Sequence, residues 1–257
     1  MTVVRADYLR RIGIHVAGRP ADLDLLRDLQ VAHVIAVPFE NLDVFHRRGV
    51  DTHLASSAAK IVDSRGGWCF ELNGAFGWLL RELGYDVAYV SCRVHGDDGW
   101  GPALDHCALV VRLDGDPWFV DVGFGDACMV PVPLRSGDHR GVPRPVQVRA
   151  DDGGFVLAER GVDGEWADQL HIDPVPRTMD EFTPRSTYLQ TEPGLMWTEK
   201  PFATRATAPD GSRVTLRNGV LRIREGAGEF VDTPVDPAEW SSLLRDHVGI
   251  DDLASRR

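Results

Sequence analysis

The 257-residue sequence predicts an α+β fold in which helices come first, antiparallel strands follow, and a mixed tail ends the chain. Three observations support this prediction. Apolar residues recur at helical spacing in the first third of the chain, and from Tyr85 the spacing changes to every second residue. Near the end, Asn218-Gly219 separates two alternating runs, which is a strong signal for a hairpin with a type I′ turn.

Two helices are predicted in the first third. Residues 21–36 place leucines at helical spacing behind Pro20, a residue suited to a first turn. The second helix begins near Cys69 and keeps its apolar pattern until Gly84, which supplies a C-terminal stop. The early chain should therefore be helical.

The middle third predicts a small barrel or sandwich of antiparallel strands, because short segments rich in valine and aromatic residues alternate with Gly, Asp and Pro clusters. These strands are residues 86–94, 106–113 and 118–124. Residues 135–145 predict a polar surface loop, and residues 155–157 and 165–170 are weaker strand candidates. In the tail, Asp236-Pro237 followed by Glu239 predicts a helix start.

The composition is that of a soluble globular protein, with 43% apolar and 26% charged residues. A net charge of −11 opposes non-specific binding to nucleic acid or anionic lipid, so neither partner is expected. The N-terminus lacks the apolar core of a signal peptide, and no run of apolar residues is long enough to span a membrane, which predicts a cytoplasmic protein. Its cysteines form no Cys-x-x-Cys pair and should be thiols.

The most informative window, residues 65–73, sets Cys69 on a glycine-rich loop at the first turn of a predicted helix. Free N–H groups and the positive end of the helix dipole favour the thiolate there, which is the reactive form. Gly66 and Gly67 would let the backbone approach a substrate carbonyl, and N–H groups after Cys69 would form part of an oxyanion hole. The alternative is that Cys69 is a small buried residue at a helix start.

A nucleophilic cysteine needs a base, and the base needs an orienting partner. His106 and Asp121 are the best pair. If Asp114-Gly115 forms a two-residue turn, Ala108 lies opposite Asp121, and His106 lies diagonally across from it on the same face. A turn with an odd number of residues would separate them. Asp121 also sits among apolar strand residues, where a buried carboxylate requires a partner.

The remaining candidates are weaker. Cys107 should point to the opposite strand face and pack there. His95 follows a strand end and is a second candidate for the base. A zinc site formed by Cys69, Cys92 and His106 lacks close ligand spacing, so no metal site is predicted.

Three blocks of this sequence resemble the arylamine N-acetyltransferase family. Arg65-Gly66-Gly67-x-Cys69-x-Glu71-x-Asn73 looks like its active-site signature. Residues 37–42, Val-Pro-Phe-Glu-Asn-Leu, and residues 120–125, Val-Asp-Val-Gly-Phe-Gly, resemble two further family segments. With Arg93-Val94 and His106, these matches occur in the family's order over the first half of the chain.

The resemblance implies a catalytic triad of Cys69, His106 and Asp121, comparable with that of cysteine proteases. It also implies three parts: a helical bundle with the nucleophile over residues 1–84, an antiparallel β-barrel with the histidine and aspartate over residues 85–185, and an α/β lid over residues 186–257.

Other site residues follow from the same resemblance. The substrate pocket would be lined by Phe39, Phe70, Val94, Phe124 and Gly125. The active-site loop would be supported by Glu40, Arg65 and Asn73. The Arg65–Glu40 pair has the simpler alternative of a purely structural ion pair.

The implied chemistry is ping-pong transfer of an acyl group from acetyl-CoA or another thioester, through Cys69, to a small amine, foremost an arylamine. CoA serves as co-substrate, and no permanently bound cofactor is expected. Residues 191–197 keep the Thr, Pro and aromatic residue of a family segment but lack its His and Ser.

That departure leaves a second reading open, the related amide synthases that take a polyketide chain from an acyl carrier protein and release a macrolactam. Two further readings are a thiol hydrolase with the same triad and a binding protein without turnover.

Overall fold

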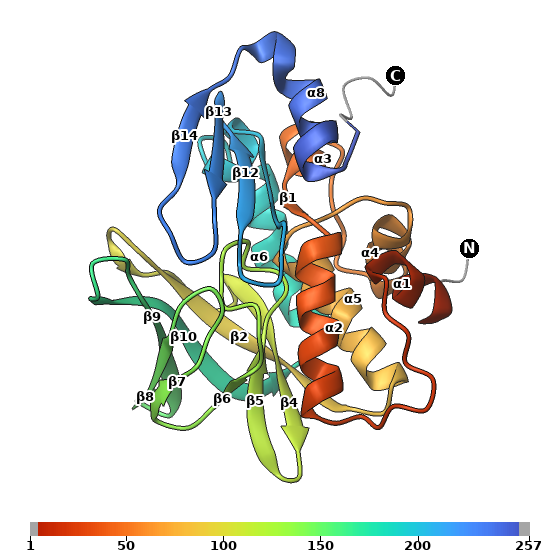
Figure 1. Cartoon of the computed structure of the whole chain (residues 1–257), viewed down its shortest axis with the longest axis vertical. Helices are drawn as coiled ribbons and strands as arrows, with labels where there is room; N and C mark the ends of the chain where they lie inside the picture. Colours follow the sequence, from red (N-terminus) through yellow and green to blue (C-terminus); the bar gives the residue numbers. More distant parts are fainter. Residues whose placement is uncertain (1–4, 252–257) are drawn as a thin grey trace.

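The structure is a computed structural model that describes residues 5–251. A group of helices packs against a curved antiparallel sheet, and a smaller sheet lies above this larger sheet in the view of Figure 1. The N-terminal helices are α1 (Arg5–Ile12), α2 (Leu23–Ala36), α3 (Leu42–Phe45), α4 (Leu54–Val62) and α5 (Cys69–Glu82). The order of helices before strands agrees with the prediction from the sequence.

The larger sheet has the strand order β6-β5-β4-β2-β10-β9-β8-β7, with β3 paired to β2, and curves into a barrel-like shape. Every pairing within it is antiparallel. Its strands are β2 (Asp86–Gly96), β3 (Gly99–Trp100), β4 (His106–Leu113), β5 (Asp116–Val120), β6 (Val132–Pro133), β7 (Gly137–His139), β8 (Val146–Asp151), β9 (Gly154–Arg160) and β10 (Trp166–Arg177).

The smaller sheet has the order β1-β11-β12-β13-β14 and pairs one strand from the N-terminal part of the chain with four strands from the C-terminal part. Its strands are β1 (Phe39–Glu40), β11 (Phe202–Ala206), β12 (Arg213–Arg217), β13 (Val220–Arg224) and β14 (Val231–Pro234). Figure 1 shows β1, drawn in orange, beside the blue strands of the tail. The remaining helical segments are α6 (Met179–Thr191), α7 (Met196–Glu199), η1 (Pro237–Glu239), α8 (Trp240–Leu243) and η2 (Leu244–Val248).

Helix α5 lies at the centre of the main core, between the other helices and strands β2 and β4. Its Phe76 and Leu79 are fully buried. At Gly77 an added Cβ would lie 2.8 Å from the Tyr89 ring and 3.0 Å from Leu109, so the missing side chain lets the helix approach the sheet closely. The helix that begins with Cys69 is therefore held rigidly against the strand that begins with His106.

Both predicted hairpins are confirmed. Leu113 pairs with Asp116 across the Asp114-Gly115 turn, and both turn residues have positive φ. Strands β12 and β13 meet at Asn218-Gly219, again with positive φ at both positions, as a type I′ turn requires.

The predicted strand over residues 118–124 is wrong at its C-terminal end, because β5 stops at Val120. The backbone N–H groups that follow β5 donate to the side chains of two buried residues instead of to a neighbouring strand. Asn73 Oδ1 accepts from the Val122 N–H at 3.0 Å, and Asp121 Oδ1 accepts from the Gly123 N–H at 2.8 Å. These bonds replace ladder pairing and turn the chain towards Cys69.

Other helix and strand boundaries also differ from those predicted from the sequence. Helix α2 begins at Leu23 because the side chain of Asp22 accepts the Leu25 N–H and caps the first turn. The predicted loop over 135–145 contains the short strand β7. Helix α6 runs through residues 185 and 186, where the barrel and lid were predicted to divide, and the three-part division stays a prediction. Within residues 5–251, no helix is both long enough and apolar enough to cross a membrane.

Candidate active site

Cys69 is the first residue of α5 and is 8% exposed. Glu71 caps this helix, because its Oε2 accepts the Trp68 N–H at 3.2 Å. The preceding loop is held against the chain that enters β1: the Glu40 N–H donates to Gly67 O at 2.9 Å, and the Gly67 N–H donates to Pro38 O at 3.3 Å. The position of the thiol is therefore fixed by both the helix start and the loop.

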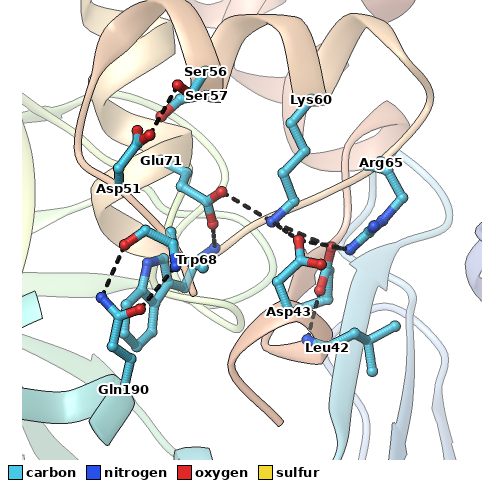
Figure 2. Close-up of polar contacts among 12 residues, drawn as sticks. Leu42, Asp43, Asp51, Ser56, Ser57, Lys60, Arg65, Trp68, Glu71 and Gln190 are labelled. Atoms are coloured by element: carbon cyan, nitrogen blue, oxygen red, sulfur yellow. Dashed lines mark hydrogen bonds and ion pairs between the residues drawn. The ribbon is translucent and has the colours of Figure 1, made fainter. Parts of the chain in front are cut away.

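Next to this loop lies a group of charged side chains, here called the Lys60 cluster, of which Figure 2 labels Asp43, Lys60, Arg65 and Glu71. It consists of Glu40, Asp43, Lys60, Arg65 and Glu71. The Lys60 ammonium lies 2.7 Å from Asp43 Oδ2, 2.9 Å from Glu71 Oε1 and 3.8 Å from Glu40 Oε1. Arg65 Nη2 lies 2.6 Å from Glu40 Oε1 and 3.2 Å from Asp43 Oδ2. The cluster connects α4, α5, β1 and α3.

Three carboxylates share two cations in the Lys60 cluster, so one negative charge is in excess. Burial raises the pKa of Glu71 to about 7, even though Lys60 acts in the opposite direction. Burial also opposes the charge on Lys60, but the carboxylates of Glu40, Glu71 and Asp43 raise the pKa of its ammonium. Lys60 therefore stays charged, and Glu71 is the group in the cluster that exchanges a proton near neutral pH.

On the other side of Cys69, the buried side chains of His106 and Asp121 are joined by a contact of 2.6 Å between Nε2 and Oδ2. The second Asp121 oxygen accepts from Asn73 Nδ2 at 2.8 Å as well as from the Gly123 N–H. Asn73 Nδ2 also donates to Cys107 O at 2.7 Å. Both carboxylate oxygens of Asp121 thus have hydrogen-bond partners, and these fix the orientation of the carboxylate towards His106.

His106 also interacts with Cys69. Burial acts to lower the pKa of the imidazole, but the charge of Asp121, its hydrogen bond and a hydrogen bond with the Cys69 side chain together raise this pKa to about 10. Since Nε2 faces Asp121, Nδ1 is the ring nitrogen left for the thiol. The carboxylate of Asp121 therefore favours the protonated form of the imidazole.

Cys69 and His106 open into one cavity of about 340 Å³. Most of its wall is apolar or aromatic and is formed by Phe39, Val94, Phe124, Leu189, Trp197 and Phe202. The Phe124 ring meets the His106 ring edge-on, with centroids 5.4 Å apart. Two carboxylates, Asp105 and Asp126, complete the lining. The Cys69 sulfur thus faces a mostly apolar cavity suited to a small organic molecule.

Comparison with known proteins agrees with this geometry. The sequence model of the N-acetyltransferase family matches residues 22–255. The chain is 35% identical over 263 residues to an arylamine N-acetyltransferase of Mycolicibacterium smegmatis, an alignment that covers 97% of this chain and 93% of the relative. The chain belongs to the arylamine N-acetyltransferase family.

More distant arylamine N-acetyltransferases also match. Human arylamine N-acetyltransferase 1 is 31% identical, over 79% of this chain and 78% of its own. The solved structure of the Mycobacterium marinum arylamine N-acetyltransferase in complex with CoA superposes with a TM-score of 0.88 at 32% identity, over 96% of this chain and 93% of the other. These matches confirm both the family resemblance and the predicted α+β architecture of helices, barrel-like sheet and C-terminal α/β part.

The structure brings most of the predicted arylamine N-acetyltransferase site together. Phe39, Val94 and Phe124 line the cavity, as expected of pocket residues. Two others lie elsewhere. The Phe70 ring is fully buried against Trp68 and Phe182 and does not line the cavity.

Gly125 also lies outside the lining. It has a φ of +95°, a backbone conformation that favours glycine, and a Cβ at this position would make only ordinary contacts of 3.6 Å with Phe39 and Thr204.

Several residues that sequence reasoning missed complete the site. Leu189, Trp197 and Phe202 come from the C-terminal third and are brought to the cavity by α6, α7 and β11. Lys60 gave no signal beyond being one of two lysines in the chain. Glu71 is part of the signature over residues 65–73 but was given no role there, although its place three positions after Trp68 is one where a capping carboxylate is favoured.

The other cysteines are buried. Cys107 faces away from the cavity and contacts Met179. Cys92 lies opposite His106 in the β2–β4 ladder, and burial raises the pKa of its thiol well above the ordinary value. Among the described residues, no group of three or more His, Cys, Asp or Glu side chains could hold a metal ion.

Proposed function

We propose that this protein transfers an acyl group from a thioester, foremost acetyl-CoA, to an arylamine through a covalent thioester on Cys69. The observation that supports this most directly is the connected chain of Cys69, His106 and Asp121 at one end of an apolar cavity. Membership of the arylamine N-acetyltransferase family supports both the donor and the acceptor class.

In the first half-reaction the Cys69 thiolate attacks the carbonyl carbon of the thioester. A new C–S bond forms to Cys69, the original C–S bond breaks, and the leaving thiolate takes a proton from the His106 imidazolium. We assign stabilisation of the oxyanion to the N–H groups at the start of α5 other than that of Glu71, which donates to Trp68 O at 3.1 Å, because the first N–H groups of a helix generally lack a partner within it. Asp121 holds the ring of His106 and stabilises its positive charge.

In the second half-reaction the amine nitrogen attacks the carbonyl carbon of the acyl-enzyme. The amide C–N bond forms, the bond to Cys69 breaks, and His106 accepts the proton that the amine loses. The rings of Phe39, Phe124 and Trp197 suit an aromatic acceptor, since aromatic pairs favour edge-on and offset contacts. CoA enters and leaves as a co-substrate, as the complex of the M. marinum relative with CoA suggests.

Intact-mass spectrometry tests this proposal. Wild type mixed with acetyl-CoA should gain the mass of one acetyl group, and adding an arylamine should remove it and release the amide. Cys69→Ala should gain nothing. Cys128→Ala is the matched control, because Cys128 is buried outside the cavity and bonds to Val130 O, and it should be acylated like wild type.

The same measurement separates the other readings. Loading by long-chain thioesters but not by acetyl-CoA would select an amide synthase that uses an acyl carrier protein. An acyl-enzyme that decays at one rate with and without amine would select a hydrolase. Absence of any adduct on wild type, whatever the thioester, would overturn the covalent mechanism altogether.

A further inference from the structure

Two buried arginines of the smaller sheet converge on one carboxylate at the catalytic cavity. Arg224 in β13 forms two hydrogen bonds to Asp126, Nη1 to Oδ2 at 2.7 Å and Nη2 to Oδ1 at 2.8 Å. Arg213 in β12 places Nε 3.0 Å from Asp126 Oδ1. The arginine side chains are 1% and 3% exposed, whereas the Asp126 side chain is 37% exposed. These ion pairs thus connect two buried side chains of the smaller sheet with a residue that lines the cavity.

Burying a guanidinium is costly unless its charge and donors are satisfied, so this arrangement needs support. Arg224 Nη2 also donates to Gly211 O at 3.2 Å, and its guanidinium lies 4.8 Å from the centroid of the Phe230 ring. Arg213 Nη1 donates to Thr204 Oγ1 at 3.2 Å. These contacts orient both guanidinium groups, while their buried Nε–H groups form no hydrogen bond among the described residues.

Asp126 connects this network to the residues that face the substrate. It lines the cavity itself and follows Phe124 by two positions. Between them, Gly125 packs against Phe39 and Thr204. The segment 123–126 is therefore fixed at its start by the Asp121 bond to the Gly123 N–H and at its end by the two arginines.

We propose that Arg224 and Arg213 are positioning residues that hold Phe124 in place as a wall of the acceptor cavity by fixing Asp126. Selection of the amine then depends on the C-terminal sheet, although neither arginine lines the cavity. The inference rests on the acyl transfer proposed above, because it assigns the arginines to the half-reaction in which the amine binds. A purely structural pair would lower stability and slow both half-reactions together.

The test compares Arg224→Met and Arg224→Lys with Arg222→Met. Arg222 is the matched control: it lies on the same strand and also stacks on Phe230, but it pairs with Asp232. Single-turnover acylation by acetyl-CoA is followed by intact mass, and steady-state kinetics are measured with aniline and with the larger naphthylamine.

In Arg224→Met the KM for aniline should rise about tenfold, which corresponds to one lost charge-assisted contact. Acylation should stay within about twofold of wild type, as for independent sites. The preference for naphthylamine over aniline should increase, because the loosened wall widens the cavity. Arg222→Met should match wild type in all three measurements. Arg224→Lys keeps the positive charge but cannot form both hydrogen bonds to Asp126, so it should show the same pattern as Arg224→Met. If Arg224→Met does not fold, the lysine variant provides the test.

A double variant tests the route through Phe124. If Arg224 acts on this ring, Arg224→Lys should change the aniline KM by less than about twofold in a Phe124→Leu background. Equal losses in acylation and in amine transfer, or fully additive effects with Phe124→Leu, would overturn the inference while leaving the proposed function intact. Failure of wild type to form an acyl-enzyme would instead refute the proposed function.

Discussion

Asn73 in α5 donates a hydrogen bond of 2.8 Å to Oδ1 of Asp121, so the helix that begins with Cys69 is joined directly to the carboxylate that holds His106. The two residues are 48 positions apart. The distance from sulfur to imidazole therefore depends on one buried amide as well as on the packing of α5 against β4.

Asn73→Ala should reduce both activity and stability. It removes the bonds to Asp121 and Cys107 O and leaves the buried Val122 N–H without its acceptor. The free energy of unfolding should fall by about 2–4 kcal/mol, as for buried polar groups left unsatisfied. Urea unfolding measures this change, and intact mass follows acyl-enzyme formation, which should slow more than stability alone explains. A variant acylated at the wild-type rate would show that the amide does not position Asp121.

Asp121→Asn should change how stability depends on pH. The pKa of His106 is raised from its ordinary 6.5 to about 10 in the folded protein. The folded state therefore keeps a proton that the unfolded chain releases, and the contribution of His106 is complete below pH 6.5 and lost as pH rises through about 10. In wild type, the different proton uptake of His106 in the folded and unfolded states lowers the free energy of unfolding by at most about 1.4 kcal/mol per pH unit between pH 6.5 and about 10.

In Asp121→Asn the decline should largely disappear, because the charge that holds the proton on His106 is gone. Urea unfolding between about pH 6 and pH 9 measures the slope. Asp168→Asn is the control, since Asp168 forms a partly exposed pair with Arg149, and it should keep the wild-type slope. An unchanged slope in Asp121→Asn would contradict the assignment to this pair.

Lys60→Met should destabilise the protein more at high pH than at low pH. Without the ammonium, three carboxylates share only Arg65, so at least one of them must take up a proton in the folded state. Loss of the Lys60 charge raises the pKa of Glu71, which burial already raises to about 7, further above that of the unfolded chain, and stability is lost as pH rises through the raised value. Near pH 8 the loss should be about 3–5 kcal/mol, as for a broken buried ion pair.

Lys200→Met controls for the general effect of removing a lysine and should stay close to wild type. Urea unfolding near pH 5 and near pH 8 gives the comparison. If Lys60→Met lost the same free energy at both pH values, the excess negative charge of the Lys60 cluster would not be the cause.

Gly66→Ala should displace the loop before Cys69. A Cβ at this position would lie 2.1 Å from Pro38 O and 2.9 Å from Cγ of Glu40, so the loop has to move away from β1. Acyl-enzyme formation should drop at least about tenfold, since small displacements of reacting groups are costly. Gly96→Ala is the control, because a Cβ there meets nothing within 4 Å. Normal acylation of Gly66→Ala would show that this loop does not set the position of the thiol.

Local signals predicted that His106 and Asp121 lie on one face of a hairpin, provided that the turn between them has two residues, but the pairing of Cys69 with them came from the family resemblance. A helix start after two glycines orients the cysteine, and a two-residue turn fixes the register that brings His106 to the side of Asp121. Both are short-range features, so the sequence of each segment contains most of the information needed to place its side chain.

The rest of the site depends on contacts between distant segments. Trp197 and Phe202 reach the cavity only because β11 pairs with β1, and no local pattern specifies that pairing. The strand over 118–124 was predicted too long for a similar reason: Asn73, far earlier in the chain, accepts the Val122 N–H that a further ladder would have used. Phe70 shows the converse, since its place next to Cys69 in sequence does not bring its ring into the cavity.

The pairing of β1 with β11 has a consequence for biosynthesis. Phe39 and Glu40 leave the ribosome early, but their strand partners, Thr204 and Ala203, are translated near the end of the chain. Until those residues have been translated, β1 has no partner strand, and the side of the cavity that Phe202 forms is missing. A shortened translation product ending before β11 would therefore lack part of the wall around Cys69.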